Sequence, residues 1–306
     1  MGTPDFAVPT LEAIIKDGHE VVGVVSQPDK PRGRGHHLAP TPVKEYAQSQ
    51  GIEVYQPLTL KSDEFMTLLL RLDPDVIVVV AYGKILPLSV LEYPKYGCVN
   101  VHGSLLPEYR GAAPMQRAII DGKRETGITT MLMAAGLDTG DMLLREAVEI
   151  GENDNFEDIH DRLAGVGACL LVKTLSGLEK GEITPKAQDD SLATYAAKIE
   201  KSDCLLDFSR SAKELHDLIR GLSPIPLSFT HMPDGKLLKV VESSVFDEER
   251  QSEAPVGTVL FADNDIKVAC GKGILSLVTV VPEGKGRMSA ADFVRGRKIA
   301  VGDILK

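Results

Sequence analysis

The feature that most constrains the fold is an alternation of apolar runs with helix-like segments. The apolar runs are rich in valine and isoleucine, are bounded by turn residues, and lie at 19–27, 52–56, 75–83 and 97–103. Helical patterns lie at 9–18, 41–51, 62–72 and 155–180. Continuously apolar strands are typical of sheets buried on both faces. The rhythm therefore predicts an α/β fold, with a parallel sheet and helices on both faces.

The first residues of the chain do not fit this rhythm. The opening MGTPDF has the composition of a turn that follows a strand, yet no apolar run precedes it. Either the edge of the sheet is built differently, or the first strand is missing and the sequence begins late; we expect the second.

A second pattern begins near residue 224, where short strand-like runs are joined by turns such as PDG and ADND. Strands at this spacing predict a small antiparallel barrel or sandwich. A helix from Ser289 closes it, and the polar stretch 184–206 is typical of a linker. We expect the phenylalanines of this part to be core residues, so that base stacking is not its mode of recognition: Phe229, Phe246, Phe261 and Phe293.

Composition argues against several classes of protein. The longest apolar runs are broken by charged residues and prolines, which argues against a transmembrane helix, and no signal peptide opens the chain. The four cysteines are far apart, which argues against a zinc site or a disulfide framework and suits a reducing cytoplasm. The net charge is −10. Any contact with RNA must therefore be made by a local basic surface.

Asn100 and His102 end the apolar run at 97–103. Residues two apart on a strand point to the same face. In a parallel sheet that end of the strand opens onto the ligand crevice. Histidine exchanges a proton near neutral pH, and an asparagine amide can hold a carbonyl oxygen that becomes negative. The alternative is a buried polar pair that is satisfied by the backbone.

A carboxylate for this pair is offered by the glycine-rich run AAGLDTGDML (134–143), which contains Asp138 and Asp141. A carboxylate beside an imidazole orients the ring and stabilises its charged form. Spacing alone does not distinguish the two aspartates.

Three runs carry a resemblance to a known family: NVHGSLLP (100–107), YRGAAP (109–114) and GLDTGDML (136–143). They resemble the formyltransferases that use 10-formyltetrahydrofolate, and the similarity extends over essentially the whole chain. The resemblance implies a formyltransferase fold, in which a catalytic domain at 1–183 has a doubly wound, mostly parallel sheet. A linker at 184–206 and an OB-like, tRNA-binding barrel domain at 207–306 follow it.

The resemblance also implies roles for individual residues. Asn100, His102 and Asp138 match the catalytic trio of the family, so Asp138 and not Asp141 is the matching carboxylate. The cosubstrate implied is 10-formyltetrahydrofolate, with no metal. The stretch that matches the family's tetrahydrofolate-binding loop consists of Ser104, Leu105, Leu106 and Pro107.

The basic run QPDKPRGRGHHLAP (27–40) is rich in proline and glycine, which predicts an irregular loop. The alternative to a functional role is a solvated loop. In the family this insertion contacts the acceptor end of tRNA, and Arg34 matches the arginine used there, while Arg32 adds a charge. The resemblance thus implies an initiator Met-tRNA partner and a cytoplasmic protein away from membranes, and we expect a monomer.

Two other functions fit part of the pattern. A related folate-dependent enzyme that formylates glycinamide ribonucleotide or an amino sugar nucleotide would share the trio and the folate loop. We expect it to lack the basic run at 27–40 and the C-terminal domain, so their presence favours tRNA. A protein of another class, a catalytically silent tRNA-binding protein, would use Asn100 and His102 only as structural residues.

Overall fold

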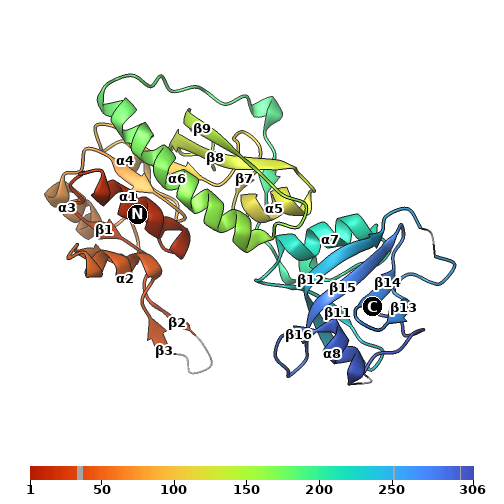
Figure 1. The fold of residues 1–306 in the computed structure, drawn as a ribbon. Helices are drawn as coiled ribbons and strands as arrows, with labels where there is room; N and C mark the ends of the chain where they lie inside the picture. Colours follow the sequence, from red (N-terminus) through yellow and green to blue (C-terminus); the bar gives the residue numbers. More distant parts are fainter. Residues whose placement is uncertain (33–36, 251, 297) are drawn as a thin grey trace. The chain divides into compact units, whose positions relative to one another are not determined.

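The computed structural model describes residues 1–306 except 33–36, 251 and 297 (Figure 1). The chain forms two compact units. The first comprises Met1–Gly111, Thr126–Glu149 and His160–Tyr195. The second comprises Ala112–Glu125, Ile150–Ile159 and Ala196–Lys306. The second unit thus includes two short pieces from the N-terminal part of the sequence, and the stretch expected as a linker is divided between the units.

The elements of the first unit follow the predicted alternation. In chain order they are η1 (Asp5–Ala7), α1 (Val8–Lys16), β1 (Val24–Val25), β2 (Lys30–Arg32), β3 (His37–Ala39), α2 (Pro42–Ser49), β4 (Val54–Tyr55), α3 (Asp63–Leu72), β5 (Ile77–Val79), α4 (Leu88–Leu91), β6 (Cys98–His102), β7 (Arg110–Gly111), β8 (Glu125–Leu132), β9 (Met142–Glu149), α6 (Phe156–Glu179), η2 (Asp190–Leu192) and β10 (Tyr195–Ala196). The four predicted helices are confirmed as α1, α2, α3 and α6.

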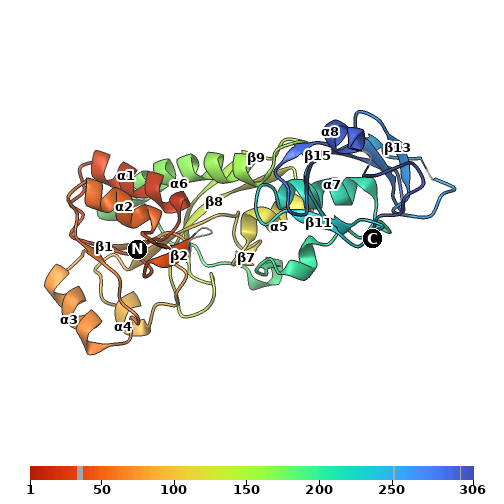
Figure 2. The same ribbon diagram turned by 90° about the horizontal axis from the view of Figure 1, so that it is seen from below.

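Local sequence explains where these helices begin. The Thr41 hydroxyl accepts a hydrogen bond from the backbone N–H of Lys44, and Pro42 occupies the first turn of α2. Ser62 caps α3 in the same way through the N–H of Phe65. A hydroxyl at this position satisfies a backbone donor that the helix leaves unpaired. Figure 2 shows α1, α2 and α6 on one face of the strands and α3 and α4 on the other.

The sheet of the first unit is mixed, with parallel pairing at β1–β4, at β5–β6 and at the Gly2–Val80 bridge, and antiparallel pairing from β6 to β8. Its order is β5-β6-β8-β9, in which β5 and β6 are parallel but β6 and β8 are antiparallel. A parallel partner for β6 needs a crossover that packs back onto the sheet. The only helix between β6 and β8 is α5 (Pro114–Ile120), which belongs to the second unit. β1 and β4 form a separate parallel pair.

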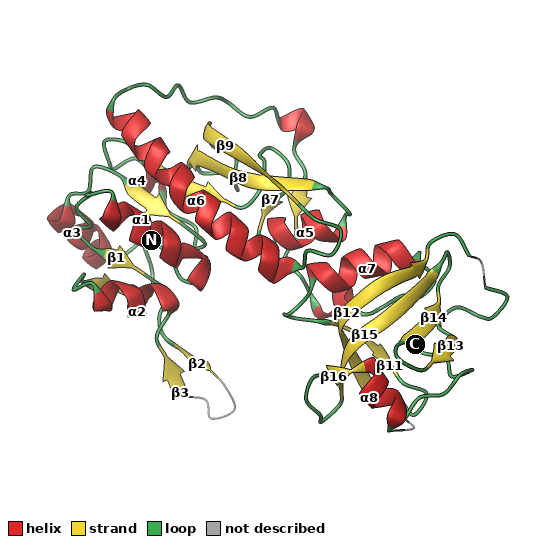
Figure 3. Cartoon of the chain, viewed as in Figure 1, coloured by secondary structure: helices red, strands yellow, loops and turns green. Residues whose placement is uncertain are grey.

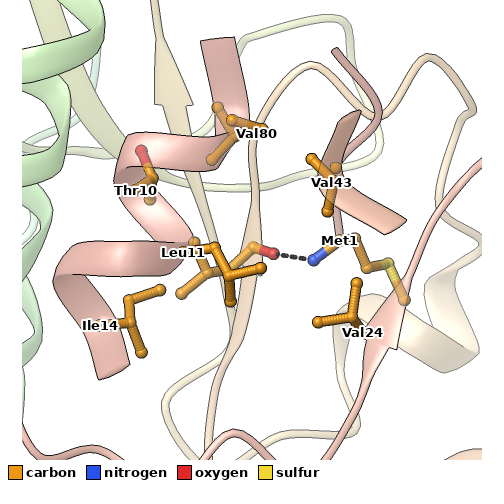
Figure 4. A pocket seen from close by; sticks show the side chains of 10 residues that line it. Met1, Thr10, Leu11, Ile14, Val24, Val43 and Val80 are labelled. Carbon is orange, nitrogen blue, oxygen red and sulfur yellow. Dashed lines mark hydrogen bonds between the residues drawn. The ribbon is translucent and has the colours of Figure 1, made fainter. Parts of the chain in front are cut away.

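The first two residues lie between β1 and β5. The N–H of Gly2 donates to the carbonyl of Val25, and the N–H of Val80 donates to the carbonyl of Met1. Beside them is a small cavity that none of the candidate site residues lines (Figure 4). Its wall is almost entirely aliphatic, so it offers little polar chemistry: Met1, Gly2, Ala7, Thr10, Leu11, Ile14, Val24, Val43, Val78 and Val80.

The basic run is not the irregular loop that its proline and glycine content predicted. β2 and β3 pair as an antiparallel hairpin, with Lys30 opposite Ala39 and Arg32 opposite His37. The Pro31 position is compatible with a strand because this hairpin is a separate two-stranded sheet, in which proline can lie at an edge. Arg34 lies outside the described residues.

The second unit is rich in antiparallel strands (Figure 3). After α5 its elements are η3 (Lys201–Cys204), α7 (Ala212–Gly221), β11 (Ser228–His231), β12 (Leu237–Asp247), β13 (Val259–Ala262), β14 (Ile266–Ala269), β15 (Ile274–Pro282), β16 (Met288–Ser289) and α8 (Ala290–Arg295). The sheet order is β11-β12-β15-β14-β13, with β16 against β15. The strands β11 and β13 do not pair with each other, because residues 303–306 lie between them: His231 exchanges backbone hydrogen bonds with Lys306, and Thr258 forms a bridge with Ile304.

Helix α7 connects the strands of this unit to α5. Its capping box, formed by Ser211 and Glu214, fixes where it begins. Gly221 allows the close approach to α5, because a Cβ there would lie 2.7 Å from the Ile120 side chain. The core includes Phe229 and Phe293, as expected.

Two other phenylalanines of this unit are not core residues. Phe246 is 50% exposed and Phe261 is 42% exposed. The expectation that both are buried was wrong, because the Lys267 ammonium group packs over both rings at the surface. Within the described part of the chain, no helix is long and apolar enough to cross a bilayer.

Candidate active site

Asn100 and His102 lie on β6, which is hydrogen-bonded to β5 on one side and β8 on the other. All five residues of the strand are buried because neighbours cover both edges and both faces. Asn100 is opposite Val79 and Met131, and His102 is opposite Thr129. The spacing of two brings both polar side chains to one face. The Asn100 side chain makes no hydrogen bond within the described residues, so its amide is available to a bound molecule.

Both ring nitrogens of His102 face oxygen atoms. Nε2 lies 2.9 Å from the carbonyl oxygen of Tyr109. Nδ1 lies 3.7 Å from Oδ2 of Asp138, which is within ion-pair range but longer than a hydrogen bond. A carbonyl can only accept, so Nε2 carries a proton. Nδ1, on the other side of the ring, faces the carboxylate of Asp138.

Asp138 lies in the loop between β8 and β9. Its Oδ2 accepts a hydrogen bond of 2.8 Å from the N–H of Gly111. Asp141, the other candidate carboxylate, is exposed, and its backbone carbonyl pairs with the N–H of Leu132. Gly140 is required here because a Cβ would lie 1.7 Å from the Leu132 carbonyl oxygen. The structure thus brings Asp138 to His102.

The two residues that contact His102 both have left-handed backbones. φ is +51° at Asp138 and +59° at Tyr109. Such conformations cost about 1–3 kcal/mol each for residues other than glycine, and they persist where surrounding contacts fix them. Strain of this kind on both sides of one histidine is typical of a functional site.

Thr129 on β8 holds the loop that follows β6, at residues 103–107, by two hydrogen bonds. Its hydroxyl donates to the carbonyl of Ser104 and accepts from the N–H of Leu106. Ser104 and Leu106 are fully buried, whereas Leu105 and Pro107 are partly exposed. Of the four predicted folate-binding residues, Leu105 and Pro107 therefore offer side-chain surface to a ligand.

Comparison with known proteins decides the family. Residues 1–175 match the family model described as formyl transferase, and residues 198–298 match the model of its C-terminal domain. The chain belongs to the formyl transferase family.

Curated formyl transferases resemble this one along its whole length. A protein named methionyl-tRNA formyltransferase from Lachnospira eligens is 50% identical over 100% of this chain and 98% of its own. One of the same name from Clostridium novyi is 48% identical with the same coverage. Among solved structures, the N-formyltransferase of Helicobacter canadensis in complex with folinic acid and dTDP-3-aminofucose superimposes with a TM-score of 0.66. It is 18% identical and covers 90% of this chain and 96% of its own.

Sequence reasoning missed two residues of this formyl transferase site, Arg110 and Gln188. The Arg110 side chain is only 2% exposed and donates to Oε1 of Gln188 from Nε and Nη2, at 3.0 and 2.9 Å. Gln188 lies in the stretch expected as a linker. The only signal for Arg110 was its place among small residues in YRGAAP, and nothing local marked Gln188.

The residues around His102 are suited to an organic ligand. The site offers a free amide, an imidazole beside a carboxylate and a partly exposed apolar loop. These groups can bind a carbonyl compound, stabilise negative charge on its oxygen and move protons. Within the described ranges, no group of three or more His, Cys, Asp or Glu side chains could hold a metal ion.

Proposed function

We propose that this protein transfers the formyl group of 10-formyltetrahydrofolate to the α-amino group of methionine on initiator Met-tRNA. The observation that carries the proposal is the identity of 46–50% to proteins named methionyl-tRNA formyltransferase, over 98–100% of the chain.

The chemistry gives each proposed catalytic residue a role. The methionine amine attacks the formyl carbon, and the carbonyl oxygen becomes negative in the tetrahedral intermediate. Asn100 donates a hydrogen bond to this oxygen, and a protonated His102 stabilises it by charge. A preorganised donor of this kind contributes about 2.7–4 kcal/mol to transition-state stabilisation.

Protons must also move during the reaction. The attacking amine loses a proton, and N10 of the folate gains one when its bond to the formyl carbon breaks. Asp138, which faces His102 and is partly exposed, is the proposed relay, acting through water. Because Nε2 of His102 lies against the Tyr109 carbonyl, the imidazole has little freedom to rotate and is kept facing Asp138.

We propose that Ser104, Leu105, Leu106 and Pro107 form the folate-binding loop. Leu105 and Pro107 supply apolar contact, and the buried Ser104 and Leu106 hold the backbone in place. The antiparallel second unit, which corresponds to the family's C-terminal domain, is proposed to be OB-like and to bind tRNA.

Arg32 and Arg34 are the proposed phosphate contacts of the basic run. Arg34→Ala is expected to raise KM for Met-tRNA. It should also make this KM less dependent on salt concentration, because fewer counterions are released on binding when a phosphate contact is lost. KM for the folate should stay near the wild-type value. A large loss of folate binding would contradict this role.

All of the proposed catalytic residues come from one chain, so the proposal needs no second subunit and we expect a monomer. Because translation is initiated in the cytoplasm, the proposal also implies a cytoplasmic protein.

The test is a formyl-transfer assay with 10-formyltetrahydrofolate and four acceptors. These are charged initiator Met-tRNA, uncharged tRNA, glycinamide ribonucleotide and dTDP-3-aminofucose. We expect transfer to the charged tRNA alone. Preference for either small molecule would contradict the proposed tRNA acceptor. Absence of transfer to all four acceptors would favour a catalytically silent tRNA-binding protein.

A further inference from the structure

A single side chain holds the loop that carries Asp138. The Nε2 atom of Gln188 donates to the backbone carbonyls of Asp138 and Gly140, at 2.8 Å each. These two bonds fix the peptide planes of Asp138–Thr139 and Gly140–Asp141. They therefore fix the part of the loop in which Asp138 has its left-handed backbone.

Gln188 is itself oriented by Arg110. The guanidinium group donates twice to Oε1 of Gln188 and once to the exposed carboxylate of Asp190, at 2.7 Å. Arginine offers only donors, and the oxygen of an amide only accepts. The amide NH₂ of Gln188 must therefore face the two carbonyls of the loop.

The segment that carries Gln188 also holds the other strained residue beside His102. The hydroxyl of Thr194 accepts a hydrogen bond of 2.8 Å from the N–H of Tyr109. The carbonyl of Thr194 accepts one of 2.9 Å from the N–H of Arg110. Residues 188–194 thus contact both left-handed positions, Asp138 and Tyr109.

We propose that Gln188 is a positioning residue for formyl transfer. Its two donated hydrogen bonds hold Asp138 in the conformation that turns the carboxylate toward Nδ1 of His102. The inference rests on the proposed role of Asp138 in formyl transfer. It gives the stretch expected as a linker a direct part in the geometry of the site.

Two substitutions separate this role from a structural one. Gln188→Glu keeps an oxygen acceptor for Arg110 but loses both amide donors, whereas Gln188→Met loses donors and acceptor. We expect each variant to lower kcat by about 10- to 100-fold, because small displacements of catalytic groups have effects of this size. KM for both substrates should stay within about twofold, since Gln188 contacts the loop and is not proposed to touch substrate.

Ser191→Ala is the matched control. Ser191 is exposed on the same segment, and its hydroxyl donates to its neighbour Asp189. It should behave as wild type. Thermal unfolding of Gln188→Glu near the wild-type midpoint would show that the fold is intact. Wild-type kcat in folded Gln188→Glu would overturn the inference.

The decisive measurement combines Gln188→Glu with Asp138→Asn, under single-turnover conditions with enzyme in excess. If Gln188 acts through Asp138, it should cause no further loss in the Asp138→Asn background. If the rate losses of the two single variants multiply in the double variant, the inference is overturned and the proposed role of Asp138 stays intact. Full activity of Asp138→Asn alone would instead overturn the proposed role of Asp138, and the inference with it.

Discussion

The Nδ1 atom of His102 and the Oδ2 atom of Asp138 lie 3.7 Å apart, and one short stretch of backbone contacts both side chains. The carbonyl of Tyr109 faces the far side of the imidazole, and the N–H of Gly111 donates to the carboxylate. Because residues 109–111 contact both side chains, the spacing between His102 and Asp138 is kept when the surrounding loops shift. The charges are therefore arranged before substrate arrives, which lowers the reorganisation needed during reaction.

Asp138→Asn should lower kcat/KM by about 100-fold or more, because it removes the proposed proton relay and the charge beside His102. The neighbouring Asp141→Asn is the matched control and should remain within about twofold of wild type. Formyl transfer to Met-tRNA is the readout, with thermal unfolding to establish that each variant is folded. Equal losses in the two variants would contradict the assignment.

Asn100→Asp should lower kcat by about 100- to 1000-fold, the usual effect of removing one oxyanion donor. The substitution preserves the shape of the side chain, but an ionised carboxylate cannot donate a hydrogen bond. Binding of the folate, measured by isothermal titration calorimetry, should change much less than kcat. An equal loss in binding would mean that Asn100 recognises the ground state.

The second unit should lose stability in acid because of His216 on α7. Burial lowers the pKa of His216, whose ring lies against Ser243 Oγ and the Glu152 carbonyl oxygen, with Asp217, Lys213 and Arg220 nearby. Below the unfolded pKa of about 6.5, the unfolded chain takes up a proton that the folded His216 resists. The neutral, buried His216 therefore costs no stability above about pH 6.5, and the free energy of unfolding decreases as the pH falls below this value.

The change that tests this is His216→Gln, which removes the titrating group. Its melting temperature should fall less between pH 7.5 and 5.5 than that of wild type, as followed by circular dichroism. His231→Gln on β11, where the side chain is partly exposed, serves as the control. A wild-type pH dependence in His216→Gln would contradict the assignment.

Thiol reagents should label Cys169 first. It is the exposed cysteine, whereas Cys98, Cys204 and Cys270 are buried. Burial raises the pKa of Cys98 to about 12 and that of Cys270 to about 11, so neither forms a reactive thiolate near neutral pH. Iodoacetamide followed by mass spectrometry should find one modified cysteine in the native protein and four in denaturant. Rapid native labelling of Cys98 would show that the first unit opens.

Short-range rules predicted the helices well. Thr41 and Ser62 each precede a helix and cap it, because an N-cap needs only a hydroxyl and a nearby N–H. Strand lengths were less predictable. The apolar run 19–27 contains a strand only at Val24–Val25, where β4 lies beside it. Apolar character reports burial, whereas strand length depends on a partner from elsewhere in the chain.

The site was predictable only in part. Asn100 and His102 share a strand, so their common face followed from spacing alone. The contact between Arg110 and Gln188 joins residues 78 positions apart, and no periodicity or turn pattern reports such a pair. The prediction of an irregular loop at 27–40 was wrong for a related reason. Proline and glycine lower strand propensity, but backbone pairing between β2 and β3 overrides it.

The packing of α7 on α5 has a consequence for protein engineering. Gly221 brings the two helices close together, and α5 comes from a part of the sequence far before the remainder of its unit. A chimera that grafts only residues 207–306 onto another enzyme would leave this face of α7 without its partner. Exchange of the C-terminal module between relatives should therefore succeed only when residues 112–125 travel with it.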